Sequence, residues 1–141
     1  MFRKTRSWIL AAGAMALVPL SSGITVAEAM EDGKLLVCAV SEVVACTDAS
    51  TCVKGPARDF DLDELAVIDI ENKMVRGHKE GGNTEQSPIK NIERSRDHLM
   101  LQGVENGRGW NVSVDTRSGA MTGAVAGEAV SFMIFGTCTA I

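Results

Sequence analysis

The stretch HLMLQGVENGRGWNVSVDTRSGAMTGAVA, residues 98–126, decides the fold of this chain. Its dipeptide Asn106-Gly107 stands between two alternating segments, and Asn-Gly is the strongest short-range signal for a two-residue β-hairpin turn. After this turn, apolar side chains alternate with polar ones at Trp110, Val112 and Val114. Residues 116–119, Thr-Arg-Ser-Gly, suit a type I turn closed by a left-handed glycine. The stretch therefore predicts three consecutive antiparallel strands, each with one buried face.

Similar short apolar segments, separated by turn residues, occur in the rest of the chain. They predict strands at residues 35–45, 63–70, 74–78, 84–94 and 130–135. Pro88 lacks an N–H and implies an edge or a bulge in its strand, Glu80 to Gly82 predicts a turn, and residues 47–58 are expected to form a loop. The chain is thus predicted to be all-β, with about eight antiparallel strands in an up-and-down barrel or, alternatively, a compact sandwich.

Residues 1–29 have the features of a secretory signal peptide. Arg3, Lys4 and Arg6 form a basic start, residues 8–26 are almost uncharged, and Ala27-Glu28-Ala29 is a small-residue cleavage site. Glycine and proline make the apolar segment a poor spanning helix, and no second long apolar segment follows it. We expect cleavage after Ala29, a single small β domain at residues 30–141 without a membrane span, and localisation to the periplasm or the medium.

Processing would make the chain more acidic. Loss of three basic residues and Glu28 would leave 11 basic and 17 acidic residues of the original 14 and 18, a net charge of −6. A protein with this charge would approach phosphate groups against its own field, so neither nucleic acid nor anionic lipid is the expected partner.

The four cysteines, Cys38, Cys46, Cys52 and Cys138, all follow the predicted cleavage site. An even number in an oxidising compartment indicates two disulfides, and four cysteines allow three pairings. We favour Cys46 with Cys52, because the residues between them form a small polar loop, and hence Cys38 with Cys138. The second bond would join the first strand to the last. A redox or zinc site is disfavoured because no C-x-x-C motif occurs and the chain has only two histidines.

Two groups of residues are candidates for binding. Arg94, Arg108 and Trp110 can bind an anionic or aromatic ligand if they meet at a concave mouth, although Trp110 can equally be a core residue. In the final predicted strand Met133 and Phe135 alternate with a second apolar row, Val130, Phe132 and Ile134. If that row fills the core, Met133 and Phe135 form an exposed patch for a partner.

Catalytic and metal-binding patterns are weak. The two histidines, His78 and His98, lie beside predicted turns without a recognisable nucleophile motif. Asp59, Asp61 and Asp63 imitate the start of a calcium loop, but its glycine and its final glutamate are missing. We therefore expect neither an enzyme nor a cofactor.

The segment ENGRGW at residues 105–110, followed by SG at 118–119 and FGTC at 135–138, resembles a group of short exported bacterial proteins without an assigned function. This resemblance implies a cysteine-stapled periplasmic β domain and supplies no catalytic residues. In architecture the chain is also similar to the small periplasmic lysozyme inhibitors, whose loop motif it lacks. The leading interpretation is a non-enzymatic envelope protein that binds another envelope or secreted protein, as an inhibitor would. The alternative is a carrier that holds a small ligand inside the barrel.

Overall fold

The computed structural model describes residues 33–78 and 85–141, in which almost all regular structure is β-strand. The predicted signal peptide and the turn predicted at residues 80–82 lie outside the described residues. The strands are β1 (Leu35–Cys46), β2 (Cys52–Gly55), β3 (Leu65–Asp69), β4 (Met74–His78), β5 (Gln86–Arg94), β6 (His98–Glu105), β7 (Arg108–Asp115), β8 (Ala120–Ala126) and β9 (Ser131–Ala140). A short 3-10 helix, η1 (Ala57–Phe60), lies between β2 and β3. These described ranges contain no helix with the length and hydrophobicity needed to cross a membrane.

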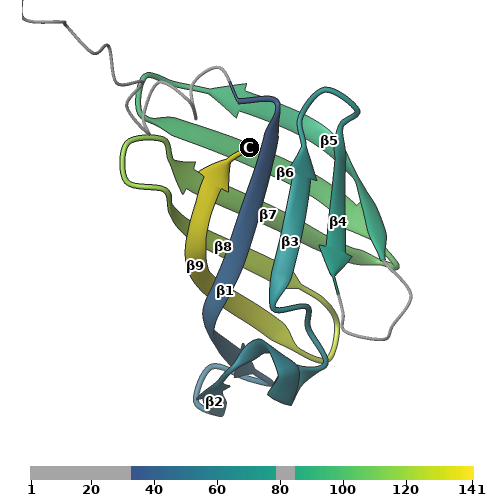
Figure 1. The fold of residues 1–141 in the computed structure, drawn as a ribbon. Helices are drawn as coiled ribbons and strands as arrows, with labels where there is room; N and C mark the ends of the chain where they lie inside the picture. The colour runs from purple at the N-terminus through teal and green to yellow at the C-terminus, as the bar shows by residue number, and fades with distance from the viewer. Residues whose placement is uncertain (1–32, 79–84) are drawn as a thin grey trace, which may run out of the picture.

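Eight of the strands form a closed antiparallel barrel (Figure 1). Each strand from β3 to β8 pairs with the next, and β1 closes the barrel by pairing with both β3 and β9. In Figure 1 the strands β9, β1, β3 and β4 lie in front and cross β5 to β8 behind them. The all-β prediction is confirmed, and of its two architectures the chain forms the barrel. Strand β2 lies outside the barrel, paired to the end of β1.

Two segments depart from the prediction. The predicted loop at residues 47–58 contains β2 and the start of η1. Strand β2 forms because the Cys46–Cys52 disulfide folds the chain back and pairs these two cysteines across a hairpin. Strand β9 continues to Ala140 instead of ending at Phe135, since its second half pairs with the start of β1. Gly136 allows this, because a β-carbon there would collide with the Ala39 carbonyl.

Both predicted disulfides are present, and no described cysteine is free. The Cys38–Cys138 bond joins β1 to β9 and belongs to the larger core cluster. The buried members of that cluster are Leu36, Cys38, Ile68, Ile89, Leu99, Leu101, Val114, Met121 and Cys138. A smaller cluster, of Val43, Ala45, Ala57 and Phe132, lies under η1. The barrel is therefore packed most densely toward the end that carries the β5–β6 turn.

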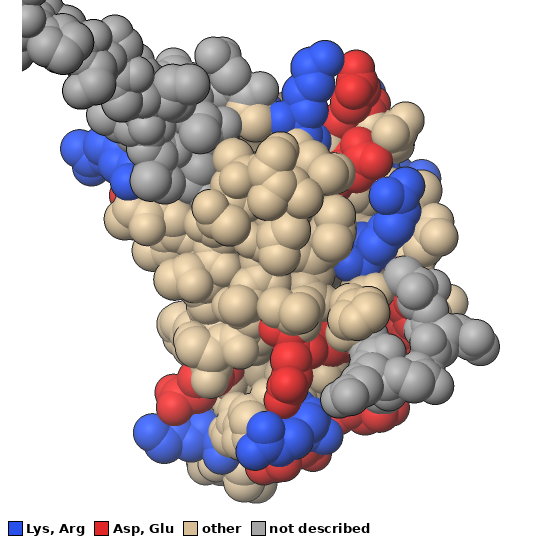
Figure 2. Space-filling model, in the orientation of Figure 1, with Lys and Arg blue, Asp and Glu red and all other residues tan. Residues whose placement is uncertain are grey.

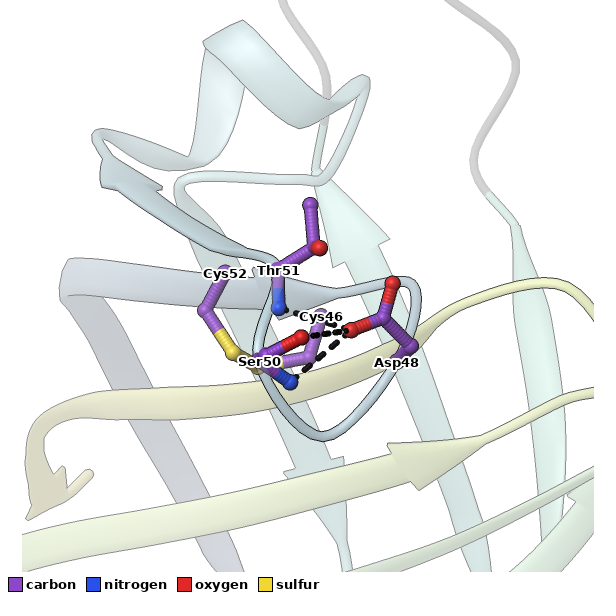
Figure 3. Close-up of a disulfide and its surroundings, with 5 residues drawn as sticks. All are labelled: Cys46, Asp48, Ser50, Thr51 and Cys52. Atoms are coloured by element: carbon purple, nitrogen blue, oxygen red, sulfur yellow. Dashed lines mark hydrogen bonds between the residues drawn. A yellow bond between two sulfur atoms is a disulfide. The ribbon is translucent and has the colours of Figure 1, made fainter.

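Asp48 orders the loop between Cys46 and Cys52 (Figure 3). Its Oδ1 accepts hydrogen bonds from the backbone N–H of Ser50 at 2.8 Å, from the Ser50 hydroxyl at 2.8 Å and from the backbone N–H of Thr51 at 2.9 Å. These bonds, the one from the Ser50 backbone foremost, lower the pKa of Asp48 from 3.8 to about 2. They stabilise the ionised form in the folded loop only. Their contribution to the stability of the folded protein is therefore complete above pH 3.8 and is lost as the pH falls through about 2.

We expect the side-chain carboxyl carbon of Asp48 to titrate near pH 2 in an NMR pH series, with the Ser50 and Thr51 amide protons shifting at the same midpoint. Asp48→Asn keeps an acceptor oxygen but cannot ionise, so the Ser50 amide shift should lose this midpoint. A titration of Asp48 at its ordinary value of 3.8 would contradict the proposed role of the three bonds.

Candidate functional site

A cavity of about 360 Å³ opens at the end of the barrel that carries the β6–β7 turn. Small-molecule sites in proteins have volumes of roughly 300–1,000 Å³. The aliphatic side chains that line it are Val40, Leu62, Ala66, Val75, Val112, Met121, Val125 and Ile134. Val40 and Ile134 pack against both core clusters, so the cavity lies between the two.

The cavity exists because small residues occupy positions of its wall. An eight-stranded barrel is just wide enough for large side chains to fill its interior. Here Ala66 on β3, Ser87 on β5 and Gly123 on β8 line the cavity and leave part of that interior empty. The far half of the barrel carries leucine, isoleucine and valine at its inward positions and is filled.

Trp110 stands in the cavity wall in a fixed orientation. Its Nε1 donates a 2.8 Å hydrogen bond to Ser87 Oγ, although β6 separates their two strands. The ring reaches across β6 because Gly103 is the cross-strand partner of Trp110, and a β-carbon at Gly103 would collide with the indole. Trp110 also packs against the larger core cluster. Trp110 is therefore in contact with the core on one side and forms part of the cavity wall on the other.

Charged residues surround the mouth of the cavity. Asp63 precedes β3, Glu85 precedes β5, Glu105 ends β6 and Arg108 begins β7, and all four line the cavity. The three carboxylates also line a smaller adjoining hollow of about 170 Å³, which Arg108 does not line. The Asp63 carboxylate lies against Gly77, where a β-carbon would collide with it. The mouth thus has an acidic side.

The predicted trio of Arg94, Arg108 and Trp110 does not come together. Arg108 and Trp110 line the cavity, whereas Arg94 ends β5 at the opposite end of the barrel and donates to the Gly33 carbonyl oxygen at 3.4 Å. The grouping was wrong for Arg94 because β5 runs from the mouth at Gln86 toward the β5–β6 turn, which carries its last residue away from the cavity.

Comparison with protein-family models, with curated proteins and with solved structures finds no match to this chain.

The two histidines of the weak catalytic pattern lie at opposite ends of the barrel. His78 ends β4 at the mouth and His98 begins β6 at the other end, so they do not act together. In residues 33–78 and 85–141 no three His, Cys, Asp or Glu side chains are grouped so that they could hold a metal ion, and this includes the aspartates at 59, 61 and 63.

Met133 and Phe135 point outward from β9, with exposed fractions of 41% and 39%, while Phe132 beside them is buried. Met133 pairs with Val44 on β1, and Leu65 on β3, also exposed, pairs with Ala39. Figure 2 shows a broad surface without charged side chains in front of β9 and β1, with charged residues at its borders. We call the outward side chains of Met133 and Phe135 the outer apolar patch.

Proposed function

We propose that this chain is a non-enzymatic exported protein that binds a small, largely apolar ligand inside its barrel. The observation that carries the proposal is the open cavity beside Trp110. Protein interiors are close-packed and contain few voids larger than a water molecule. An open apolar cavity with a few polar groups at its rim is the usual form of a small-molecule site.

The chemistry of the wall favours a ligand with an apolar body. Aliphatic side chains surround most of the cavity, and burying apolar surface against them contributes about 25 cal/mol per Å². The indole of Trp110 adds a flat surface on which a ring or a chain can pack, and its N–H is already bound to Ser87.

Fluorescence can test this directly, because the chain contains two tryptophans, Trp8 and Trp110. In the processed protein, from which the predicted signal peptide carrying Trp8 has been cleaved, Trp110 is the sole reporter. We expect the neutral apolar probe N-phenyl-1-naphthylamine to become fluorescent on binding and to quench Trp110 saturably with the same dissociation constant. Failure of the probe to bind, or binding without any change at Trp110, would count against a site in the barrel.

A cavity-filling variant sharpens this test. Gly123 lines the cavity, and a β-carbon there would meet no atom closer than 3.5 Å, so Gly123→Leu can be accommodated and should occupy the cavity. We expect affinity for the probe to fall about tenfold or more, which corresponds to about 1.4 kcal/mol. Thr122→Leu is the matched control, since Thr122 is exposed and pairs with the outward Phe135. Equal losses in both variants would refute binding inside the barrel.

The two disulfides fit an oxidising compartment. We place the protein in the periplasm or outside the cell because residues 1–29 have the pattern of a signal peptide. Mass spectrometry of the exported protein should give an N-terminus at or within a few residues of Met30, and a full-length chain in the membrane fraction would contradict this.

The outer apolar patch supports a second candidate function, which is binding of another envelope or secreted protein. Monomeric proteins rarely expose contiguous apolar surface unless it takes part in an interaction. On this hypothesis Phe135 is a contact residue, and its substitution should weaken capture of a partner from a periplasmic extract without unfolding the barrel.

A further inference from the structure

We propose that the ligand of the barrel is an amphiphile with a cationic head, such as a primary amine or a guanidinium on an apolar body. This inference rests on the proposed function, because it concerns the same cavity. It adds the charge of the ligand and the residues that recognise it.

The charges at the mouth are not arranged symmetrically. Asp63, Glu85 and Glu105 line both the main cavity and the smaller adjoining hollow, whereas Arg108 lines the main cavity alone. A ligand head in the hollow would therefore face the carboxylates of Glu85 and Glu105. Opposite charge favours a cation there, and the same field opposes the carboxylate or phosphate of an anionic amphiphile.

The hollow and the cavity are parts of one site. Ala66, Val75 and Ser87 line both, together with the three carboxylates. A single molecule can thus place its apolar body against the aliphatic wall and its head among the carboxylates. The cavity of about 360 Å³ has the volume of a small-molecule site and can take the apolar body, while the adjoining hollow of about 170 Å³ can take the head group.

The acidic side of the mouth suits an organic cation better than a metal ion. None of the described carboxylates belongs to a set of three ligands close enough to hold a metal. An ammonium or guanidinium group needs no such convergence, because it is attracted by carboxylates spread around it and donates hydrogen bonds in several directions.

The test is competition by three probes with the same tail: decylamine, decanol and decanoate, each displacing N-phenyl-1-naphthylamine at pH 7.5. At this pH the amine is cationic and the acid anionic. We expect decylamine to bind about threefold to tenfold more tightly than decanol, and decanoate to bind most weakly. The preference for decylamine over decanol should shrink as salt rises, because salt screens exposed charges.

Substitutions at the mouth test which residues cause the preference for decylamine over decanol. In Glu85→Gln/Glu105→Gln the preference for decylamine should fall by about threefold or more, while decanol binds unchanged. Glu93→Gln is the control for a carboxylate away from the mouth, since Glu93 lies near the far end of β5 and pairs with Met100. Equal binding of all three probes, or a loss of preference in the control as large as in the double variant, overturns the cationic assignment and leaves the apolar site standing. Failure of decanol and N-phenyl-1-naphthylamine to bind at all overturns the proposed function itself.

Discussion

Replacing Cys38 and Cys138 together by alanine should lower the free energy of unfolding by about 4–5 kcal/mol. The bond closes a loop with a sequence separation of 100, and loop-closure entropy in the unfolded chain grows with the logarithm of that length. Small domains are stable by about 5–15 kcal/mol, so this change alone can leave much of the population unfolded at 37 °C. Urea denaturation followed by circular dichroism measures the loss.

The matched control is Cys46→Ala/Cys52→Ala, which removes a bond with a sequence separation of 6. The same entropy relation predicts that this variant lowers the free energy of unfolding by about 2 kcal/mol. If the two double variants lose the same stability, loop length does not govern the effect, and strain or local packing must account for it.

Phe132→Ser should destabilise the barrel by about 3–5 kcal/mol. Phe132 is 8% exposed and packs edge-to-face against Phe60, with ring centroids 6.3 Å apart. Its removal leaves a cavity beneath η1 and places a hydroxyl among apolar neighbours. We expect a correspondingly lower urea midpoint with an unchanged slope.

Phe135→Ser is the control for this prediction and the test of the outer apolar patch. Phe135 is 39% exposed on the opposite face of the same strand, so its replacement should change stability by only about 0.5 kcal/mol. On the second candidate function it should also weaken capture of a protein partner. If Phe135→Ser unfolds the barrel as severely as Phe132→Ser does, the outer face contributes to folding, and the argument for a docking patch is lost.

Local turn chemistry explains why part of the fold could be predicted from the sequence. Strand β7 begins directly after the predicted turn at Asn106 and Gly107, and β7 ends and β8 begins at the predicted turn of residues 116–119. Asn106 and Gly107 both have positive φ, 47° and 76°, and Gly119 has φ 76°. These conformations favour asparagine and glycine, so the residues themselves mark the turns.

The segments that differ from the sequence-based prediction depend on contacts between residues that are distant in sequence. The end of β9 has no strong strand pattern of its own and forms because β1 lies beside it. In β5 the bulge falls between Ile89 and Asn91 rather than at Pro88 itself. Bulge position is determined by how both neighbouring strands fit, and a single residue does not specify it.

The candidate site was only partly predictable, because it too is formed by residues that are distant in sequence. Alternation along β6 would have placed Glu105 in line with the inward Leu101 and Gly103, and alternation along β5 would have placed Ser87 in line with Ile89. Asp63 and Glu85 precede their strands, and outside a strand the alternation of inward and outward residues does not predict which way a side chain points. Only closure of the barrel brings them to one mouth.

The seam between β1 and β9 has a consequence for how the chain is made. On the proposed export, Cys38 reaches the oxidising compartment long before Cys138, whereas Cys46 and Cys52 follow Cys38 after 8 and 14 residues (46 − 38 and 52 − 38). Neighbouring hairpins form from local contacts, but β1 must wait for the last strand before the barrel can close. During this interval Cys38 is near in sequence to two wrong partners and has no correct one. Each newly made chain therefore depends either on late oxidation of Cys38 or on a disulfide isomerase that can undo an early mistake.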